Sequence, residues 1–234
     1  SKKQEKHLFF HRFWFGNTKK ARKANAFSFD MLSQVNELLA QVPRDTGALV
    51  ITGRSGLFSG GFDLKTMATG DMEKITKMVQ MGYRLLLELY SFDRPIIAAV
   101  SGHSIALGLF VTCSADYRIA IDGEYICQAN EVRNNMDIPT PIMEILKARV
   151  NKNYFYPAVY HSDAYSMQES IAVGFIDEVV PHTEFMNRVM EKAKELASLP
   201  HPFYANTKKS AQEDVRKKIS NAIDKYENLT GLKS

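Results

Sequence analysis

The stretch SGLFSGGFDLK at residues 55–65, taken together with SGHSIALGLF at residues 101–110, decides the fold of this chain. Each follows an apolar run typical of a buried strand, ALVIT at 48–52 before the first and PIIAAV at 95–100 before the second. Each then turns through glycines into an apolar segment that predicts the start of a helix. Such junctions leave main-chain N–H groups at a helix N-terminus, where negative charge is favoured. Two of these N–H groups facing one another would form an oxyanion hole.

The length and composition are those of an ordinary globular protein. The chain has 234 residues, of which 45 % are hydrophobic and 24 % charged, which suits one domain or one domain with a helical appendage. No window approaches the roughly 18 consecutive apolar residues of a membrane span. The N-terminus is basic and aromatic and lacks the apolar region and cleavage site of a secretion signal. We therefore expect a cytoplasmic protein with no membrane partner.

The cysteine and histidine patterns give no signal for a metal site. Cys113 and Cys127 lie in apolar contexts without CxxC spacing, and we expect both to be small buried hydrophobic residues. The six histidines show no HExxH motif and no ligand-like pairing. We therefore expect no metal.

The charge of the chain is informative mainly through one basic run. A formal net charge of +4 is too small to require a nucleic-acid partner. The run precedes residue 25 and consists of Lys19, Lys20, Arg22 and Lys23. Such a run is most often a solvated loop, and the alternative is a phosphate-binding site, because clustered cations suit a polyphosphate ligand.

Strand and helix patterns alternate along the first 180 or so residues, which predicts an α/β core. The predicted strands lie at 8–15, 48–52, 95–100 and 174–180. Asp122-Gly123 lies between two short strand patterns within 116–127 and predicts a hairpin. The predicted helices lie at 28–42 and 71–90, capped by Ser28 and Asp71, and at 139–149, 166–173, 183–198 and 203–229.

Five segments together resemble the crotonase superfamily, which contains the enoyl-CoA hydratases and isomerases. They are KANAF at 23–27, FSGGFDLK at 58–65, SGHSIALG at 101–108, ANEV at 129–132 and AVGFIDEVV at 172–180. Their order and spacing match the family pattern over most of the chain. The resemblance implies a spiral of repeated β-β-α turns at residues 1–182, followed by a helical region at 183–234 that serves trimerisation.

The resemblance also implies a function, namely an acyl-CoA enzyme whose oxyanion hole polarises a thioester carbonyl. By position, the first donor is the main-chain N–H of Phe62 and the second is that of Leu107, with Gly108 as the alternative if the register differs by one. A coenzyme A thioester is the implied substrate, no cofactor is tightly bound, and the implied assembly is a homotrimer or a hexamer made of two trimers. The implied coenzyme A contacts are Arg22, Lys23, Ala24, Asn25, Ala26, Gly60, Asp63 and Leu64.

The carboxylates distinguish between the reactions of this family. Its hydratases use two glutamates around a water; the position of the first is Phe110 here, and the position of the second is Glu131. Moving a double bond along an enoyl chain needs one base, whereas adding water commonly needs two groups. We therefore predict Glu131 as the general acid/base of an enoyl-CoA isomerase of fatty acid metabolism. The alternative is an enoyl-CoA hydratase, a lyase, in which Asp137 would restore the second carboxylate.

Two further alternatives are not enzymes. The run KKARK at 19–23 invites comparison with a crotonase homologue that binds RNA, although it is short and does not lie along a predicted helix face. The loss of the first glutamate would also suit a silent scaffold that binds coenzyme A. Three polar residues have predicted structural roles: Asp63 as a helix cap, His103 as a turn-stabilising hydrogen-bond partner, and Asp116.

Overall fold

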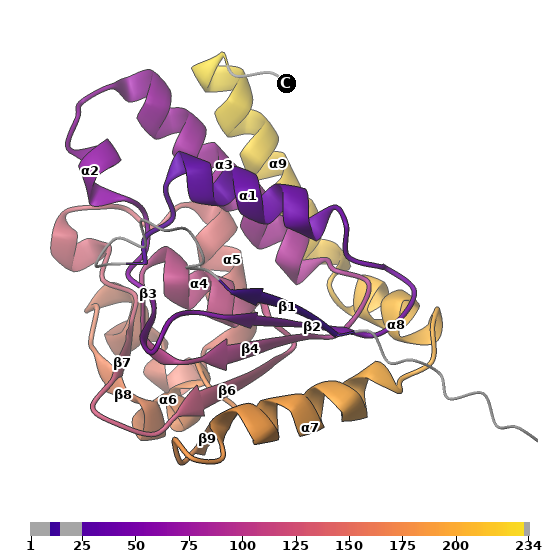
Figure 1. Ribbon diagram of the computed structural model, residues 1–234. Coiled ribbons are helices and arrows are strands. Elements are labelled where there is room, and N and C mark those ends of the chain that lie inside the picture. The colour runs from indigo at the N-terminus through magenta and orange to yellow at the C-terminus, as the bar shows by residue number, and fades with distance from the viewer. Residues whose placement is uncertain (1–9, 15–24, 232–234) are drawn as a thin grey trace, which may run out of the picture.

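The computed structural model describes residues 10–14 and 25–231, and side chains from residue 25 onward (Figure 1). The larger sheet is entirely parallel, with spatial order β1-β2-β4-β6-β9. Its strands are β1 (Phe10–Trp14), β2 (Ala48–Thr52), β4 (Ile96–Val100), β6 (Tyr117–Ile121) and β9 (Glu178–Val180). The smaller sheet has the order β3-β5-β7-β8, and only its β7–β8 pair is antiparallel. Its strands are β3 (Gly56–Ser59), β5 (Gly102–Ile105), β7 (Ile126–Gln128) and β8 (Tyr165–Ser166).

Consecutive strands alternate between the two sheets, so that β2, β4 and β6 of the larger sheet are followed by β3, β5 and β7 of the smaller one. The first pair leads into α2 (Leu64–Met67) and α3 (Met72–Tyr90), and the second into α4 (Leu107–Ser114). This repetition is the β-β-α turn that the family resemblance implies. The α/β prediction is confirmed.

The hairpin predicted around Asp122 and Gly123 is wrong. Strand β6 pairs with β4 and β9, whereas β7 pairs with β5 and β8 in the other sheet. The N–H of Asp122 donates to the carbonyl oxygen of Val180, at 2.8 Å, which continues the ladder toward β9. The Asp-Gly pair therefore marks a change of sheet, because distant strands supply better partners for both flanking segments.

The remaining helices are α1 (Phe29–Leu39), α5 (Thr140–Arg149), α6 (Met167–Val173), α7 (Phe185–Ala197), α8 (Phe203–Ala211) and α9 (Glu213–Thr230). Short 3₁₀ and π turns cover Val132–Asn134, Lys152–Tyr154 and Tyr156–Tyr160. Ser28 and Asp71 cap α1 and α3 as predicted, accepting hydrogen bonds from the N–H groups of Met31 and Lys74 at 3.3 and 3.2 Å. The single helix predicted at 203–229 is divided into α8 and α9 at Gln212.

Both faces of the central strands β2, β4 and β6 are buried, as expected for parallel strands. Ala48 and Val50 of β2 face a core shared with α7, whereas Leu49 and Ile51 face the larger core beneath α1 and α3. Figure 1 shows α7 along one side of this sheet, with α1 and α3 on the other side. Helix α9 packs against α3 and α5. The C-terminal helices thus contribute to the core of their own chain, and the predicted role of residues 183–234 in trimerisation stays a prediction.

Arg94 connects the C-terminal helices to the larger sheet. Its side chain is buried, with 2 % exposed, just before β4. The guanidinium donates hydrogen bonds to the carbonyl oxygens of Gly47 at 2.9 Å, Ala197 at 3.1 Å and Leu199 at 3.1 Å. One side chain therefore pairs carbonyl groups from the start of β2 and from the end of α7.

Replacing Arg94 with Met should lower the free energy of unfolding by about 2–4 kcal/mol, because three carbonyl oxygens lose their donor. The control is Lys217→Met, since Lys217 makes an ion pair with Glu213 in which the two side chains are 68 % and 62 % exposed. That change should have little effect on stability, because solvent screens an exposed pair. Chemical denaturation of both variants measures the difference, and equal losses would contradict the assigned role of Arg94.

Candidate active site

The two glycine turns of the sequence lie against one another. A methyl group built on Gly61, which has φ of 97°, would lie 2.8 Å from Cβ of Ala106 and 3.4 Å from the main-chain N of Leu107. A methyl group on Gly108 would lie 2.5 Å from the carbonyl oxygen of Ser59. The parallel pairing of β3 with β5 brings the two turns to the same edge of the smaller sheet.

In the first turn, hydrogen bonds made by the residues on either side of Phe62 fix its position. The N–H of Phe27 donates to the carbonyl oxygen of Gly61 at 2.8 Å, and the N–H of Asp63 donates to the carbonyl oxygen of Phe27 at 3.1 Å. These two bonds flank Phe62 and leave its own N–H outside the bridge. Within residues 25–231, this N–H makes no main-chain hydrogen bond.

The second turn carries an unusual backbone conformation at Ala106. This residue has φ of 52° and ψ of −127°, and its N–H donates to the carbonyl oxygen of Gln128 at 3.0 Å. Such a conformation costs a non-glycine residue about 1–3 kcal/mol. Leu107 then begins α4, where an N–H has no acceptor within the helix, and it donates to no main-chain carbonyl in the described part of the chain.

Glu131 is a buried carboxylate at the end of the same sheet. It follows β7 and precedes the turn Val132–Asn134, and 7 % of it is exposed. Its Oε2 atom has no hydrogen-bond partner among the described residues. Burial raises the pKa of Glu131 from 4.5 to about 7. The carboxyl group can therefore exchange a proton near neutral pH.

Helix α3 lies close to both turns and to the Glu131 carboxylate. Gly82 of this helix lies against the side chains of Phe62 and Leu107. At the next residue, burial raises the pKa of the Tyr83 hydroxyl, and the nearby Tyr226 and Glu131 raise it further. Strands β5 and β7 are parallel, and Ile105 pairs with Gln128 at their C-terminal ends. Leu107 and Glu131, which follow these strands, therefore lie at the same end of the smaller sheet. The structure thus brings Phe62, Leu107 and Glu131 to one region.

The coenzyme A contacts implied by the resemblance are only partly covered by the structure. Arg22, Lys23 and Ala24 lie outside the described residues. Asn25 is buried, and its Nδ2 donates to the carbonyl oxygen of Phe58 at 2.5 Å, which is a structural contact.

The other implied contacts surround the first turn. Ala26 and Gly60 are half-buried, and Leu64 is 74 % exposed. The Asp63 carboxylate accepts hydrogen bonds from the N–H and hydroxyl of Thr66, at 3.2 and 2.8 Å, so the predicted helix cap is confirmed.

The two positions that bear on the choice of reaction, residues 110 and 137, differ in burial. Phe110 is fully buried in the main core, whereas Asp137 is exposed in the loop before α5. Nδ1 of His103 accepts a hydrogen bond from the N–H of Ile126 at 3.1 Å, as predicted for a turn-stabilising residue. Asp116 accepts from the N–H of Ile96 and pairs with Lys208, both at 2.8 Å, which confirms its structural role.

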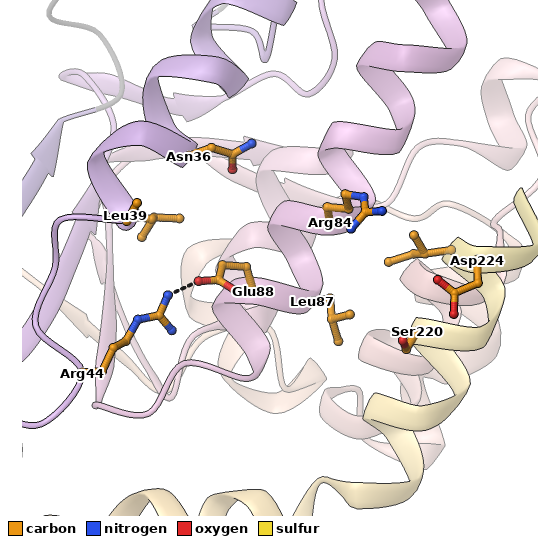
Figure 2. Close-up of a pocket in the computed structure, with 10 residues that line it drawn as sticks. Asn36, Leu39, Arg44, Arg84, Leu87, Glu88, Ser220 and Asp224 are labelled. Atoms are coloured by element: carbon orange, nitrogen blue, oxygen red, sulfur yellow. Dashed lines mark hydrogen bonds and ion pairs between the residues drawn. The ribbon is translucent and has the colours of Figure 1, made fainter. Parts of the chain in front are cut away.

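A cavity of about 390 Å³ lies away from this region, between α1, α3 and α9 (Figure 2). Arg44 and Glu88 form an ion pair at one side of it, and Arg84 and Asp224 line another part. None of the predicted site residues from Asn25 onward lines it. In the described residues there is no cluster of His, Cys, Asp and Glu that could hold a metal, and no helix long and apolar enough to cross a membrane.

Comparison with known proteins agrees with the resemblance seen in the motifs. The profile of the family described as enoyl-CoA hydratase/isomerase matches residues 18–230. The chain belongs to the enoyl-CoA hydratase/isomerase family.

Solved structures of family members have the same fold. An enoyl-CoA hydratase/isomerase family protein from Pseudomonas syringae is 30 % identical, with a TM-score of 0.86 over 92 % of each chain. A probable enoyl-CoA hydratase from Mycobacterium tuberculosis is 34 % identical, with a TM-score of 0.84 over 90 % of this chain and 89 % of that one. The crotonase fold is therefore confirmed.

The relatives include proteins named for both reactions. The M. tuberculosis protein is also described as an enoyl-CoA isomerase. Human mitochondrial enoyl-CoA delta isomerase 1 is 23 % identical over 75 % of this chain. The chain spans about 60 % of the length of that relative and of human mitochondrial enoyl-CoA hydratase domain-containing protein 3.

Sequence reasoning missed two residues near the candidate site, Gly82 and Tyr83. Both lie within the helix predicted at 71–90. A glycine in the middle of such a helix was the available signal, because it lowers helix stability without an evident local reason.

The raised pKa of Glu131 predicts a pH-dependent cost in stability. A carboxyl group whose pKa is higher in the folded than in the unfolded state destabilises the fold fully above the folded pKa, and this cost vanishes below the unfolded pKa. With values of about 7 and 4.5, the cost at pH 8 is on the order of 3 kcal/mol. Glu131→Gln should therefore raise the free energy of unfolding at pH 8 much more than at pH 5.

Chemical denaturation at the two pH values measures this difference. The exposed Glu124, in the loop before β7, provides the control variant Glu124→Gln, which should show no such pH dependence. An equal effect of Glu131→Gln at both pH values would contradict the buried, proton-exchanging carboxyl group.

Proposed function

We propose that this chain is an acyl-CoA enzyme that moves the double bond of an enoyl-CoA thioester. The N–H groups of Phe62 and Leu107 would bind the thioester oxygen, and Glu131 would transfer the proton. The observation that carries this proposal is the buried Glu131 carboxyl group, with its pKa near 7, at the edge where the two glycine turns meet.

The reaction is a proton transfer within one substrate. The Glu131 carboxylate takes a proton from the α carbon of a 3-enoyl thioester, and the C–H electron pair moves into a dienolate. The developing negative charge on the thioester oxygen is stabilised by main-chain N–H donors that are already oriented. The protonated Glu131 then returns the proton to the γ carbon, which gives the 2-enoyl thioester and regenerates the carboxylate.

The pKa of Glu131 suits both halves of this reaction. A group with a pKa near the working pH is ionised often enough to act as a base and acidic enough to return the proton. Burial of the carboxyl group accounts for that pKa without a second charged partner.

Isomerisation is favoured over hydration because a second carboxylate is lacking at the position where the family's hydratases carry one. Phe110 occupies it with a fully buried ring. Asp137 is the alternative second acid, and it is exposed in the loop after Val132–Asn134. Hydration remains the competing reaction, supported by the relatives named as hydratases.

Family membership supports a coenzyme A thioester as the substrate. Contacts of Arg22, Lys23, Gly60 and Leu64 with that ligand belong to this proposal. The cytoplasmic location and the homotrimeric or hexameric assembly also stay predictions.

The first test compares 3-enoyl-CoA and 2-enoyl-CoA as separate substrates for the wild-type chain and for Glu131→Gln. We expect double-bond migration, and a turnover lower by about 10²–10⁴ in the variant, because the amide cannot accept the proton. Glu124→Gln should retain activity. Incorporation of solvent oxygen into the product, abolished by Asp137→Asn, would contradict isomerisation and establish hydration with two acids.

The second test is the pH dependence of kcat/KM with 3-enoyl-CoA, which reports the free enzyme. The base must be ionised, so kcat/KM should fall about tenfold per pH unit below a pKa near 7. Glu131→Gln should lose this dependence and keep only its residual rate. An apparent pKa near 4.5 would show that Glu131 is solvated in the working enzyme, which would contradict the proposed mechanism.

A further inference from the structure

Gly82 lies near the middle of α3 and is buried. Glycine in a helix interior lowers helix stability by about 1 kcal/mol relative to alanine, so its presence calls for a packing reason. A methyl group built at Gly82 would lie 2.5 Å from Cζ and 2.7 Å from Cε1 of Phe62, and 3.3 Å from Cδ2 of Leu107. The side chains of these two residues therefore fill the space that any larger residue would need.

The two residues that contact Gly82 are those whose N–H groups are proposed to bind the thioester oxygen. The bridge to Phe27 fixes the main chain around Phe62. Leu107 is 1 % exposed, and the next residue, Gly108, lies against Ser59. Contacts within the turns thus hold the main chain of both donor residues, and α3 contacts their side chains.

Helix α3 is itself anchored beside Gly82. The ring of Tyr83 packs edge-to-face on Tyr226 of α9, with ring centroids 5.7 Å apart. Arg84 pairs with Glu227 of α9 at 2.5 Å, and only 8 % of the Glu227 side chain is exposed. Because these contacts fix the helix, an added methyl group would displace the side chains of Phe62 and Leu107 rather than α3.

We propose that Gly82 is a positioning residue for the oxyanion hole: its missing side chain seats Phe62 and Leu107 against α3 so that their N–H groups point at one oxygen. This inference rests on the proposed function of the two N–H groups. It makes the hole a three-part structure, in which the two turns supply the donors and α3 sets their spacing.

The test is Gly82→Ala, a change that raises helix propensity. We expect kcat to fall about 10–100-fold with KM within about threefold, because misaligned donors lose stabilisation of the transition state rather than of the bound substrate. The structural readout is the carbonyl stretching frequency of bound butyryl-CoA labelled with ¹³C at the thioester carbonyl. Polarisation lowers this frequency in the wild-type complex, and Gly82→Ala should return it toward the value of free butyryl-CoA.

The companion variant is Phe62→Leu, whose shorter side chain lacks the two nearest ring atoms. In that background Gly82→Ala should cost less than about threefold in kcat, since the main source of overlap is removed. Leu89→Ala controls for loss of core packing on α3, because residue 89 lies about 10 Å further along the helix axis. It should lower thermal stability and leave kcat unchanged.

The outcomes separate this inference from the proposed function. A wild-type complex whose carbonyl frequency matches that of free butyryl-CoA would contradict the oxyanion hole itself. A lowered frequency in the wild type, with the same frequency and kcat in Gly82→Ala, would overturn the role of Gly82 alone. Equal losses from Gly82→Ala in the wild-type and Phe62→Leu backgrounds would also overturn it.

Discussion

The close approach of the turns after β3 and β5 is the constraint on which the rest of the structure depends. Glycine at positions 61 and 108 allows it, because a side-chain methyl at either would lie within 3 Å of the opposite turn. The contact fixes Phe62 and Leu107 relative to one another, although they are distant in the chain. It also explains why both segments follow the same pattern of strand, glycine turn and helix, since each must reach the same edge of the smaller sheet.

Three features around this contact lower the stability of the fold. Ala106 adopts a conformation that favours glycine. Glu131 is buried, and one of its oxygens has no hydrogen-bond partner in the part of the chain that the structure describes. Gly82 interrupts a helix that alanine would strengthen. Each feature lowers the stability of the fold, and each lies at or next to the three proposed functional groups. Such a concentration of local costs is typical of a site selected for chemistry.

Sequence reasoning succeeded where the cause of a structure is local. Ser28 and Asp71 begin their helices as predicted because a capping side chain acts within three residues of itself. It failed at Asp122-Gly123, where the choice between a hairpin and a change of sheet depends on strands far along the chain. The motif positions of Phe62, Leu107 and Glu131 could be read from the sequence, but the burial of Glu131 and the contacts of Gly82 required three-dimensional neighbours.

Burial of Glu131 also bears on which proton the proposed reaction could use. An isomerase must return to the γ carbon the proton that it took from the α carbon, and a carboxyl group shielded from water loses less of it to exchange with solvent. A hydratase instead needs a water molecule oriented beside the base, and commonly a second polar group to hold that water. The fully buried ring of Phe110 supplies no such group, while the main-chain donors serve either reaction equally well. Under the proposed function, the environment of Glu131, rather than the main-chain donors, would therefore select the reaction.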